Sequence, residues 1–547
     1  MRIIDQLRET AAIHGFGYTV RRSANLAGQI LFGTYDRKWR GEKASADELR
    51  RQRDNCPDAG LISVVIPVYN TDPGMLEALL RSLSEQSYSH WEAVLYDGCS
   101  TRPETVAVLD RAAEKETRFR VIHGKENLGI SGNTNKAIAL AEGGYVALCD
   151  HDDLLSADAL WRVAGAICRD DPDMIYSDED MITENGKRHI DPHYKPDYCP
   201  ESLACDNYIC HLTVIRKTLL EKIGGLRPGF DGSQDHDLFL RCAAGTDRIV
   251  HLPYTLYSWR KVRSSMSRRN LQKCLDAGCR AAEDHAAALG RKATALPVDK
   301  KIRLWYGIPE NVTVEALIHG DSVEACRECC DQLTAATHWP GLTAALVVTD
   351  DGGRFAALNE AAAGSRADYL LLLDASVRIV TRHFFRELLM YAQCDGVAGV
   401  TPVITDSRHR IIHGGFAAGV KGQAQCVAEG MRAGAGGWHD MMNKVHNVSA
   451  VSACCTLIRR DQFLPFDERF RSGLGSVEQG LRQLELGRRF VYTPYAEAWT
   501  EPSALLLNGK ERNEKDAALL KDLRGDALYD PCYSGRYRKK KADWRAF

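Results

Sequence analysis

The sequence predicts an α/β protein built from two mostly parallel, doubly wound sheets that follow one another along the chain. Apolar, β-branched runs alternate with amphipathic stretches from residue 61 onward, which is typical of a parallel sheet covered by helices. The same alternation begins again near residue 312, and an internal repeat of this kind indicates two like domains in tandem. A chain of 547 residues is long enough for two or three domains.

Residues 1–58 are rich in Arg, Lys and Asp and contain a helix-like stretch at 24–32, which predicts a helical N-terminal arm. The first domain is predicted at residues 59–305. Its first four strands are expected at 61–69, 91–96, 119–123 and 145–149, and its first helices at 73–86, 103–113 and 131–141. Strands separated by helices in this way form a parallel, doubly wound sheet.

The pattern after residue 150 is less regular. Helices are expected at 157–168 and 270–289, a strand at 174–176, an acidic segment at 177–180, and mixed segments up to residue 260. The second domain is predicted at 310–505, with strands at 314–318, 344–350 and 369–374 and helices at 326–333 and 355–363. Residues 506–547 are expected to form a basic and aromatic C-terminal tail.

Composition limits the classes of function. A hydrophobic content of 44% and a charged content of 26% are ordinary for a globular domain, and a net charge of −2 offers no basic field to nucleic acid. No apolar stretch approaches the roughly 20 residues that span a bilayer, and the N-terminus lacks a signal peptide's apolar core. We therefore expect a cytoplasmic protein. Cys326-x-x-Cys329-Cys330 is the one suggestive cysteine cluster, and it lacks the second pair of a zinc site.

The most informative segment is an acidic turn after an apolar strand, where Asp150, Asp152 and Asp153 lie within four residues. A strand that is apolar on both faces lies inside a parallel sheet, so the turn is expected at the carboxyl edge, where open α/β folds bind ligands. Clustered carboxylates suit Mg²⁺ or Mn²⁺, which take substrate phosphates as further ligands. We therefore predict that these three residues bind a metal that holds a diphosphate. The alternative is a solvated turn with Asp153 or Ser156 as a helix cap.

Ordered motifs between residues 64 and 260 resemble the GT-A nucleotide-diphospho-sugar glycosyltransferases of inverting family 2. They are found at residues 64–70, 95–100, 126–129, 150–153, 229–238 and 256–260. The second half resembles the same family more weakly, from about residue 312 to 503. The resemblance implies two tandem, Rossmann-like GT-A domains and a metal bound by Asp150 and Asp152.

The resemblance also implies which residues bind the donor nucleotide. They are Pro67, Tyr69, Asn70, Asp97, Asn127, Asp150 and Arg260. Tyr69 offers a ring for base stacking, Asp97 can accept a hydrogen bond from a ribose hydroxyl or a base N–H, and Arg260 can donate to phosphate oxygens. Ordinary turns at residues 67–70, 97–98 and 127–129 are the alternative.

Asp235 is the catalytic base that the resemblance implies. Displacement at an anomeric carbon requires the acceptor hydroxyl to lose its proton while the nucleoside diphosphate leaves, and a single displacement inverts the carbon. A helix is expected at 236–242, with Gln234 and Asp235 at its start, where the helix dipole favours an anion. An N-cap is the alternative for Asp235, and Asp237 is the alternative base. Gln234, Asp237 and Trp259 are expected on the acceptor side.

Two departures from the family pattern stand out. Many relatives place His before the Trp259 equivalent, whereas this chain has Ser258, which leaves a third protein ligand of the metal open, with His251 as a candidate. The second domain has Ser376 and Ser476 in place of Asp152 and Asp235. We therefore predict that it is non-catalytic and orients the acceptor glycan or the first domain. An idle scaffold is the alternative.

The expected function is an inverting, Mn²⁺- or Mg²⁺-dependent transfer of sugar from a nucleoside-diphosphate sugar to a glycan or lipid-linked glycan of surface polysaccharide, O-antigen or capsule. A basic, aromatic tail favours peripheral contact with the inner face of the cell membrane, although a solvated tail has the same composition. A sugar nucleotidyltransferase should carry a Gly-rich phosphate loop where this chain has residues 67–71. A glycan-binding scaffold would not need Asp150, Asp152 and Asp235, and a glycoside hydrolase would not need a diphosphate-binding acidic turn.

Overall fold

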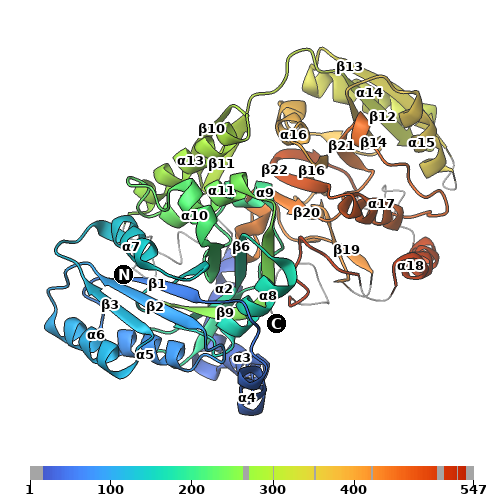
Figure 1. Cartoon of the computed structure of the whole chain (residues 1–547). Coiled ribbons are helices and arrows are strands. Elements are labelled where there is room, and N and C mark those ends of the chain that lie inside the picture. Colours follow the sequence, from blue (N-terminus) through green and yellow to red (C-terminus); the bar gives the residue numbers. More distant parts are fainter. Residues whose placement is uncertain are drawn as a thin grey trace. The chain divides into compact units, whose positions relative to one another are not determined.

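A computed structural model describes residues 16–262, 270–299, 301–349, 353–420, 423–501, 510–525 and 528–537. The chain divides into two compact units, Arg21–Leu304 and a second made mainly of Trp305–Phe547. Both are α/β, as predicted, and Figure 1 shows a sheet flanked by helices in each. None of the helices in the described ranges combines the length and apolar character needed to cross a bilayer.

The N-terminal unit follows the predicted alternation closely. Its helices are α2 (Phe16–Phe32), α3 (Thr34–Glu42), α4 (Ala46–Asp54), α5 (Pro73–Ser84), α6 (Pro103–Lys115), α7 (Gly129–Leu140), α8 (Ala159–Asp170), α9 (Pro200–Cys205), α10 (Lys217–Ile223), α11 (Gln234–Gly245) and α13 (Leu271–Ala288). Its strands are β1 (Ile62–Val68), β2 (Trp91–Asp97), β3 (Phe119–His123), β4 (Tyr145–Leu148), β5 (Leu154–Leu155), β6 (Met174–Ile182), β7 (His189–His193), β8 (Thr213–Arg216), β9 (Ile249–Arg260) and the hairpin β10 (Ala293–Val298) and β11 (Lys301–Tyr306).

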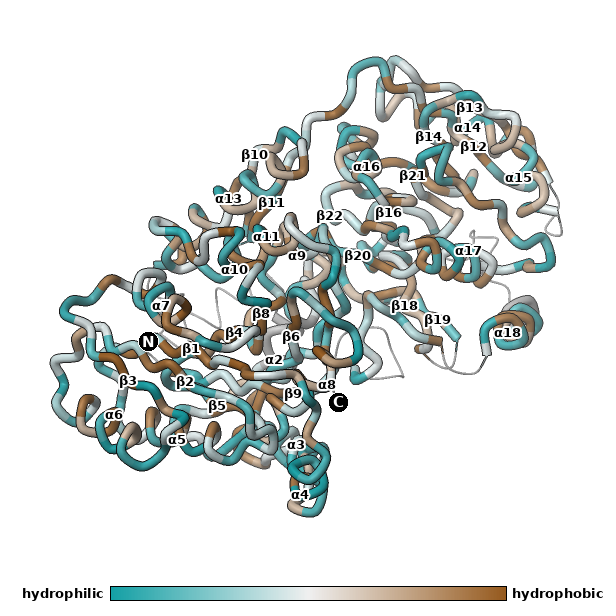
Figure 2. Tube along the Cα trace, in the orientation of Figure 1, coloured by the Kyte–Doolittle hydropathy of each residue, from teal (hydrophilic) through white to brown (hydrophobic). Residues whose placement is uncertain are grey.

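The strands of this unit lie in the order β3-β2-β1-β4-β8-β6-β9-β5, with β7 paired to β6. The predicted strands β1 to β4 run parallel to one another, and every residue of β1, β2 and β4 is buried. Beyond the acidic turn the sheet is mixed, because β8 runs antiparallel to both β4 and β6. Figure 2 shows the apolar character of the central strands.

Local sequence explains why the regular elements form where they do. Asp72 accepts hydrogen bonds from the backbone of Gly74 and Met75 at the start of α5, and Pro73 occupies its first turn. Leu76, Leu79, Leu80 and Leu83 then form one buried stripe against the sheet. The carboxyl edge of the sheet is thereby left to the loops that follow β1, β2 and β4.

The segment predicted as an arm packs against the same unit, at β7. The ring of Trp39 in α3 stacks on His189, with centroids 3.5 Å apart and an interplanar angle of 14°. The buried carboxylate of Asp36 accepts the backbone N–H of His189 at 3.1 Å, and Gln29 Oε1 accepts that of Asp191 at 2.6 Å. Helices α2 and α3 therefore satisfy backbone groups along β7, which lies off the main path of the sheet.

The C-terminal unit has the strands β12 (Val314–Gly320), β13 (Leu342–Val348), β14 (Tyr369–Asp374), β15 (Arg378–Ile379), β16 (Val397–Thr405), β17 (Ile411–His413), β18 (Phe416–Ala418), β19 (Ala424–Cys426), β20 (His446–Val448), β21 (Cys455–Arg459) and β22 (Arg489–Trp499). Its helices are α14 (Val323–Thr337), α15 (Arg354–Gly364), α16 (Phe384–Ala392), η2 (Trp438–Asn443), η3 (Arg460–Gln462), α17 (Leu474–Glu485) and α18 (Lys510–Arg524).

The second sheet repeats the topology of the first. Its order is β13-β12-β14-β21-β16-β22-β15, and each neighbouring pair has the same relative direction as its counterpart in the N-terminal unit. The strand order contains no counterpart of β3 within the described residues. The internal repeat seen in the sequence is thus a repeat of structure.

Asp36→Ala should loosen the contact between α3 and β7, because the buried N–H of His189 loses its acceptor. An unsatisfied buried donor costs about 1 to 3 kcal/mol, which corresponds to exchange of the His189 amide roughly 5- to 100-fold faster. Hydrogen exchange followed by mass spectrometry of the β7 peptides measures this. Glu42→Ala is the control, because it removes the exposed 3.6 Å ion pair with Lys38 at the end of the same helix. Equal protection in the two variants would show that Asp36 does not hold β7.

Candidate active site

The acidic turn follows β4 at the carboxyl edge of the first sheet, where the sequence predicted it. The Asp150 and Asp152 side chains are 35% and 22% exposed, so solvent and ligands can reach both. Burial, together with the charge of Asp150, raises the pKa of Asp152 despite the neighbouring His151. The turn therefore holds two accessible carboxylates that repel each other, an arrangement that a bound cation would stabilise.

Asp153 was predicted as a third metal ligand, and the structure corrects this. Its side chain is buried, and its two oxygens accept hydrogen bonds from the Tyr257 hydroxyl and the Arg260 backbone N–H, both at 2.7 Å. Burial raises the pKa of Asp153 well above its usual range. Asp153 therefore attaches the turn to β9 and does not face the ligand side.

Arg260 and Trp259 lie where β9 passes the acidic turn. Arg260 Nε donates to the carbonyl oxygen of Asp152 at 2.6 Å, and its Nη1 donates to the carbonyl of Glu184 at 3.2 Å. Burial lowers the pKa of Arg260. The Trp259 ring centroid lies 5.5 Å from that of His211. Arg260 therefore lies at the acidic turn, where two backbone carbonyl oxygens hold its guanidinium in position.

A histidine that the sequence did not single out also lies at the turn. His211 Nε2 is 3.6 Å from Asp150 Oδ2, and the His211 ring stacks on Tyr257 with centroids 4.8 Å apart. The antiparallel register of β4 and β8 pairs Leu148 with Thr213, so residues just after β4 meet residues just before β8. Only this strand pairing, which the sequence pattern does not reveal, could have identified His211.

The alternative ligand His251 lies elsewhere. Its ring nitrogens are 2.9 Å from Asp178 Oδ1 and 3.1 Å from Asp197 Oδ1, and it stacks on Tyr176. Hydrogen bonds to both carboxylates outweigh burial and raise the pKa of His251. Both ring nitrogens of His251 therefore already have carboxylate partners. The structure does not support His251 as a third ligand of the metal.

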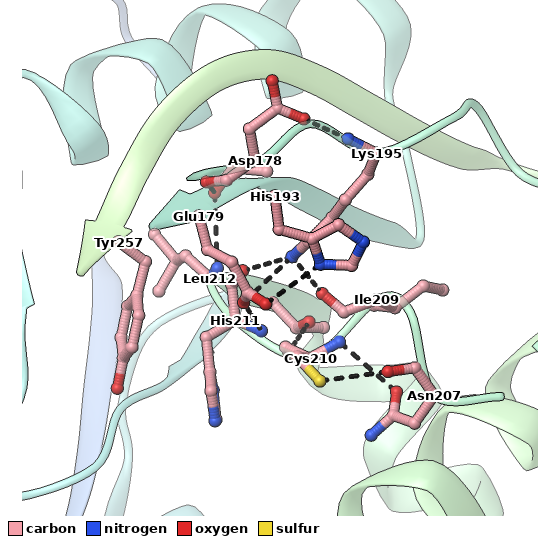
Figure 3. Close-up of polar contacts among 12 residues, drawn as sticks. Asp178, Glu179, His193, Lys195, Asn207, Ile209, Cys210, His211, Leu212 and Tyr257 are labelled. Atoms are coloured by element: carbon pink, nitrogen blue, oxygen red, sulfur yellow. Dashed lines mark hydrogen bonds and ion pairs between the residues drawn. The ribbon is translucent and has the colours of Figure 1, made fainter. Parts of the chain in front are cut away.

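The loop that carries His211 rests on a buried ion pair. Lys195 is fully buried, and its Nζ donates to Glu179 Oε2 at 3.2 Å and to the carbonyl of His211 at 2.6 Å. The N–H of His211 donates to the same Glu179 oxygen at 3.2 Å. Although burial alone would raise it, the charges of Lys195 and His193 lower the pKa of Glu179 to about 2. Figure 3 shows these contacts and the His211 and Tyr257 side chains that extend from them.

Asp235 lies in the first turn of α11, whose N-cap position is Ser233. Its Oδ2 accepts a hydrogen bond from Asn207 Nδ2 at 3.0 Å, and its Oδ1 accepts the N–H of His236 at 2.9 Å. The carboxylate is only partly buried. Gln234 turns back to accept the N–H of Gly232 at 2.7 Å. The predicted base is therefore a held but accessible carboxylate at a helix N-terminus, and the N-cap alternative does not apply.

Asp237 was predicted on the acceptor side, and this is corrected. It is 1% exposed and forms ion pairs with Arg227 and Arg241, the second at 2.7 Å. The pairing of Asp237 with Arg241 joins successive turns of α11, and that with Arg227 ties the preceding loop to the helix. Both arginines already compensate the buried charge, so Asp237 stabilises the fold.

The residues expected to bind the nucleoside lie in the loops after β1, β2 and β3. Tyr69 follows β1 with 43% of its surface exposed. Asn70 Oδ1 accepts the N–H groups of Thr101 and Arg102, each at 2.9 Å, which joins the first two loops. Pro67 is the buried residue before the end of β1.

Asp97 and Asn127 mainly hold these loops. Asp97 Oδ1 accepts the N–H of Ser100 at 3.0 Å, while its Oδ2 lies 3.0 Å from His123 Nδ1. The hydrogen bond to Asp97 raises the pKa of His123. Asn127 Oδ1 accepts the N–H of Gly129 at 3.0 Å. Each oxygen of Asp97 has a second lone pair, so contact with a nucleoside would add to these hydrogen bonds.

The equivalent positions of the C-terminal unit have different chemistry. Asp374 is buried, and its Oδ1 accepts hydrogen bonds from the backbone and hydroxyl of Ser376 at 3.0 and 2.7 Å. Ser476 is buried and accepts the N–H of Ala453 at 3.2 Å. Glu478 pairs with Arg482 four residues later, as Asp237 pairs with Arg241. The C-terminal unit therefore keeps the ion pair that stabilises this helix, but it has serines in place of the accessible Asp152 and Asp235.

No group of three or more His, Cys, Asp or Glu side chains in the described part of the chain is arranged to hold a metal ion. Asp150 and Asp152 fit the alternative in which a divalent ion uses one or two carboxylates and takes its other ligands from water and phosphate. The accessibility of both carboxylates agrees with that donor set.

Two curated proteins are similar in sequence to most of this chain. The chain is 33% identical over 502 residues to uncharacterized protein y4gI of Sinorhizobium fredii, covering 84% of this chain and 54% of that protein. It is 30% identical over 470 residues to O-antigen biosynthesis protein RfbC of Myxococcus xanthus, covering 79% of this chain and 36% of that protein. The chain thus spans only about half or less of the lengths of these relatives.

Among solved structures, S. aureus TarS 1-349 in complex with UDP-GlcNAc matches with 21% identity over 41% of this chain and 66% of that chain, at a TM-score of 0.34. The family model described as glycosyl transferase family 2 matches residues 63–224, which include β1, the acidic turn and His211. Asp235 and Arg260 lie beyond the matched residues. The segment 63–224, which carries the acidic turn and His211, belongs to glycosyl transferase family 2.

Proposed function

We propose that the N-terminal unit is an inverting glycosyltransferase that moves a sugar from a nucleoside-diphosphate sugar to a glycan hydroxyl. One observation carries this proposal. The first unit presents Asp150, Asp152 and Asp235 as accessible carboxylates, whereas the repeated fold of the second has a buried Asp374 with Ser376 and Ser476. Because both units build the same sheet, the carboxylates of the first are not needed for folding.

The acidic turn would hold the donor's diphosphate through Mn²⁺ or Mg²⁺ bound by Asp150 and Asp152. Such an ion would neutralise the charge that develops on the leaving nucleoside diphosphate. Arg260 adds a cation beside Asp152, and its anchored guanidinium limits the orientations it can take. Tyr69, Asn70, Asp97 and Asn127 would line the nucleoside side, with Tyr69 offering its exposed ring to the base.

Asp235 would remove the proton of the acceptor hydroxyl. The hydrogen bond from Asn207 fixes the direction of one carboxylate oxygen, and the start of α11 favours the ionised form. A carboxylate on the acceptor side and a neutralised leaving group on the other suit a single displacement, which inverts the anomeric carbon. Trp259 and Gln234 remain candidates for acceptor contacts.

The acceptor class is inferred from the relatives. One of them is named as an O-antigen biosynthesis protein, which supports a glycan or lipid-linked glycan of the cell surface as acceptor. The C-terminal unit would orient that glycan. Peripheral contact with the inner face of the membrane stays a prediction, because the cationic run at residues 538–541 lies outside the described residues.

Nucleotide binding should require both the metal and Asp150. In calorimetry with UDP, GDP, CDP, ADP and dTDP, the tightest ligand should bind with Mn²⁺ and weaken at least about tenfold with chelator or in Asp150→Asn. Without the ion the carboxylates and phosphates repel each other, and in Asp150→Asn the ion loses one of its two protein ligands. Asp247→Asn, at an exposed position, is the matched control. Unchanged affinity after chelation would exclude the proposed metal contact.

Asp235→Asn should leave nucleotide affinity nearly intact and lower turnover by roughly 10² to 10⁴, the usual contribution of a positioned base. Release of nucleoside diphosphate from UDP-glucose, UDP-GlcNAc, GDP-mannose and dTDP-rhamnose, with water or glycan as acceptor, measures turnover. Asp237→Asn should instead destabilise the unit by on the order of 2 kcal/mol, because Arg227 and Arg241 lose the buried charge that faces both of them. If Asp237→Asn lowered turnover in a folded protein and Asp235→Asn did not, Asp237 would be identified as the base.

Ser476→Ala tests the inactivity of the C-terminal unit in the full chain. Its hydroxyl accepts one buried backbone N–H, so a stability loss of about 1 kcal/mol is expected while turnover stays unchanged. Thermal unfolding and the same release assay measure the two effects. A turnover loss comparable to that of Asp235→Asn would assign chemistry to the second unit.

A further inference from the structure

We propose that His211 binds the diphosphate of the donor, with its Nε2–H donating a hydrogen bond to a phosphate oxygen beside Asp150. This inference rests on the proposed function and names a further residue of that site. It depends on three observations: the position of the ring at the acidic turn, the rigid support of its loop, and the replacement of the histidine in the second unit.

The imidazole has hydrogen-bonding capacity that the described residues leave unused. Its Nε2 lies 3.6 Å from Asp150 Oδ2, which is longer than a hydrogen bond, and its Nδ1 is buried without a partner. The His211 side chain is only 8% exposed, so this polar ring is almost entirely buried. Buried polar groups are almost always paired, and this one lacks a partner next to an accessible carboxylate.

The backbone of His211 and one face of its ring are held by neighbouring side chains. Lys195 and Glu179 hold the carbonyl and N–H of His211, and Tyr257 packs against one face of the ring. Tyr257 also accepts the N–H of Asp150 at 3.1 Å through its hydroxyl. The same side chain thus sets both His211 and Asp150. Binding a phosphate there would require little reorganisation, which favours affinity.

The same loop reaches the proposed base. Asn207 donates to Asp235 at 3.0 Å and accepts the N–H of Cys210 at 3.3 Å through its Oδ1. Residues 207–211 therefore connect Asp235 with the acidic turn. Because one short loop contacts both Asp235 and the acidic turn, it would set the position of the bound diphosphate relative to the base.

The second unit offers an internal comparison. Tyr145 pairs with Arg216 in the first sheet, and Tyr369 pairs with Arg459 in the second, so the position five residues earlier is His211 in one unit and Cys454 in the other. Asp152 and Asp235 correspond to Ser376 and Ser476. The histidine is therefore absent from the unit that lacks the other polar groups of the site, while the strand pairing persists.

A phosphate hydrogen bond fits the site better than direct coordination of a metal. No three His, Cys, Asp or Glu side chains in the described ranges are arranged around a common ion position. A histidine N–H that donates to a charged phosphate contributes enough to change affinity roughly 10- to 100-fold. The ring therefore contributes binding that does not depend on its coordinating the ion.

The test compares His211→Asn with His211→Gln in the full chain. The Gln amide nitrogen reaches the position of Nε2, whereas the Asn amide reaches only that of Nδ1. Calorimetry with Mn²⁺ and inorganic pyrophosphate, and with the tightest of UDP, GDP, CDP, ADP and dTDP, should show affinity roughly 10- to 100-fold weaker for His211→Asn and mostly retained for His211→Gln. His90→Asn, at an exposed histidine, is the control, and thermal unfolding without ligand checks that each variant folds.

Two results would overturn the proposal while leaving the proposed function intact. One is wild-type pyrophosphate affinity in a folded His211→Asn. The other is a pulsed electron paramagnetic resonance signal of imidazole nitrogen bound directly to Mn²⁺ in the wild type that disappears in both variants, because His211 would then be a metal ligand. If the wild-type protein binds none of the nucleotides or pyrophosphate, the proposed function fails as well, which the wild type alone reveals.

Discussion

The candidate site depends on the antiparallel pairing of β8 with β4. In a purely parallel sheet the residues before β8 would lie at the opposite edge from the end of β4, because parallel strands all end at one edge. Reversal of one strand brings the start of β8 to the acidic turn, and with it His211. It also places the loop of residues 207–211 where Asn207 can reach α11. The mixed half of the sheet therefore gathers groups that are far apart in the chain.

A buried charge supports this arrangement at an energetic cost. Removal of Lys195 and Glu179 from water costs several kcal/mol per ion, and their attraction offsets this only when further hydrogen bonds satisfy the remaining groups. Lys195 donates to two backbone carbonyls as well as to Glu179, and His193 also pairs with Glu179. The result is a loop with one well-defined conformation, which a purely apolar contact would not specify as sharply.

The parts of the fold that sequence reasoning predicted are those that depend on local patterns. Buried β-branched strands and leucine stripes fixed β1 to β4 and their helices within a few residues, and the repeat was visible in the run that ends at Asp374. The positions of the acidic turn and of Asp235 at a helix start followed from the same patterns, whereas Arg260 was assigned from the family resemblance.

Reasoning from sequence was wrong where partners come from distant segments. Asp153 and Asp237 look like site residues along the chain, but β9 and two arginines respectively satisfy them in the interior. His211 was missed for the converse reason, since nothing near it in the sequence indicates an acidic neighbour. The acidic segment at 177–180 was likewise not recognised as part of the long buried strand β6. Non-local pairing, which single-sequence periodicity does not encode, decided each case.

The exchange of Asp152 for Ser376 has a consequence for how the two units have diverged. In the first unit, neighbouring anions are kept together although they repel each other, and this lowers stability in the absence of ligand. In the second, the hydroxyl and backbone N–H of Ser376 both donate to one oxygen of Asp374, so a hydrogen-bond donor stands where the first turn has a second anion. This is the direction expected when selection for activity is relaxed and selection for folding remains. The duplicated fold thus carries, within one chain, a version of the turn shaped by chemistry and a version shaped by stability.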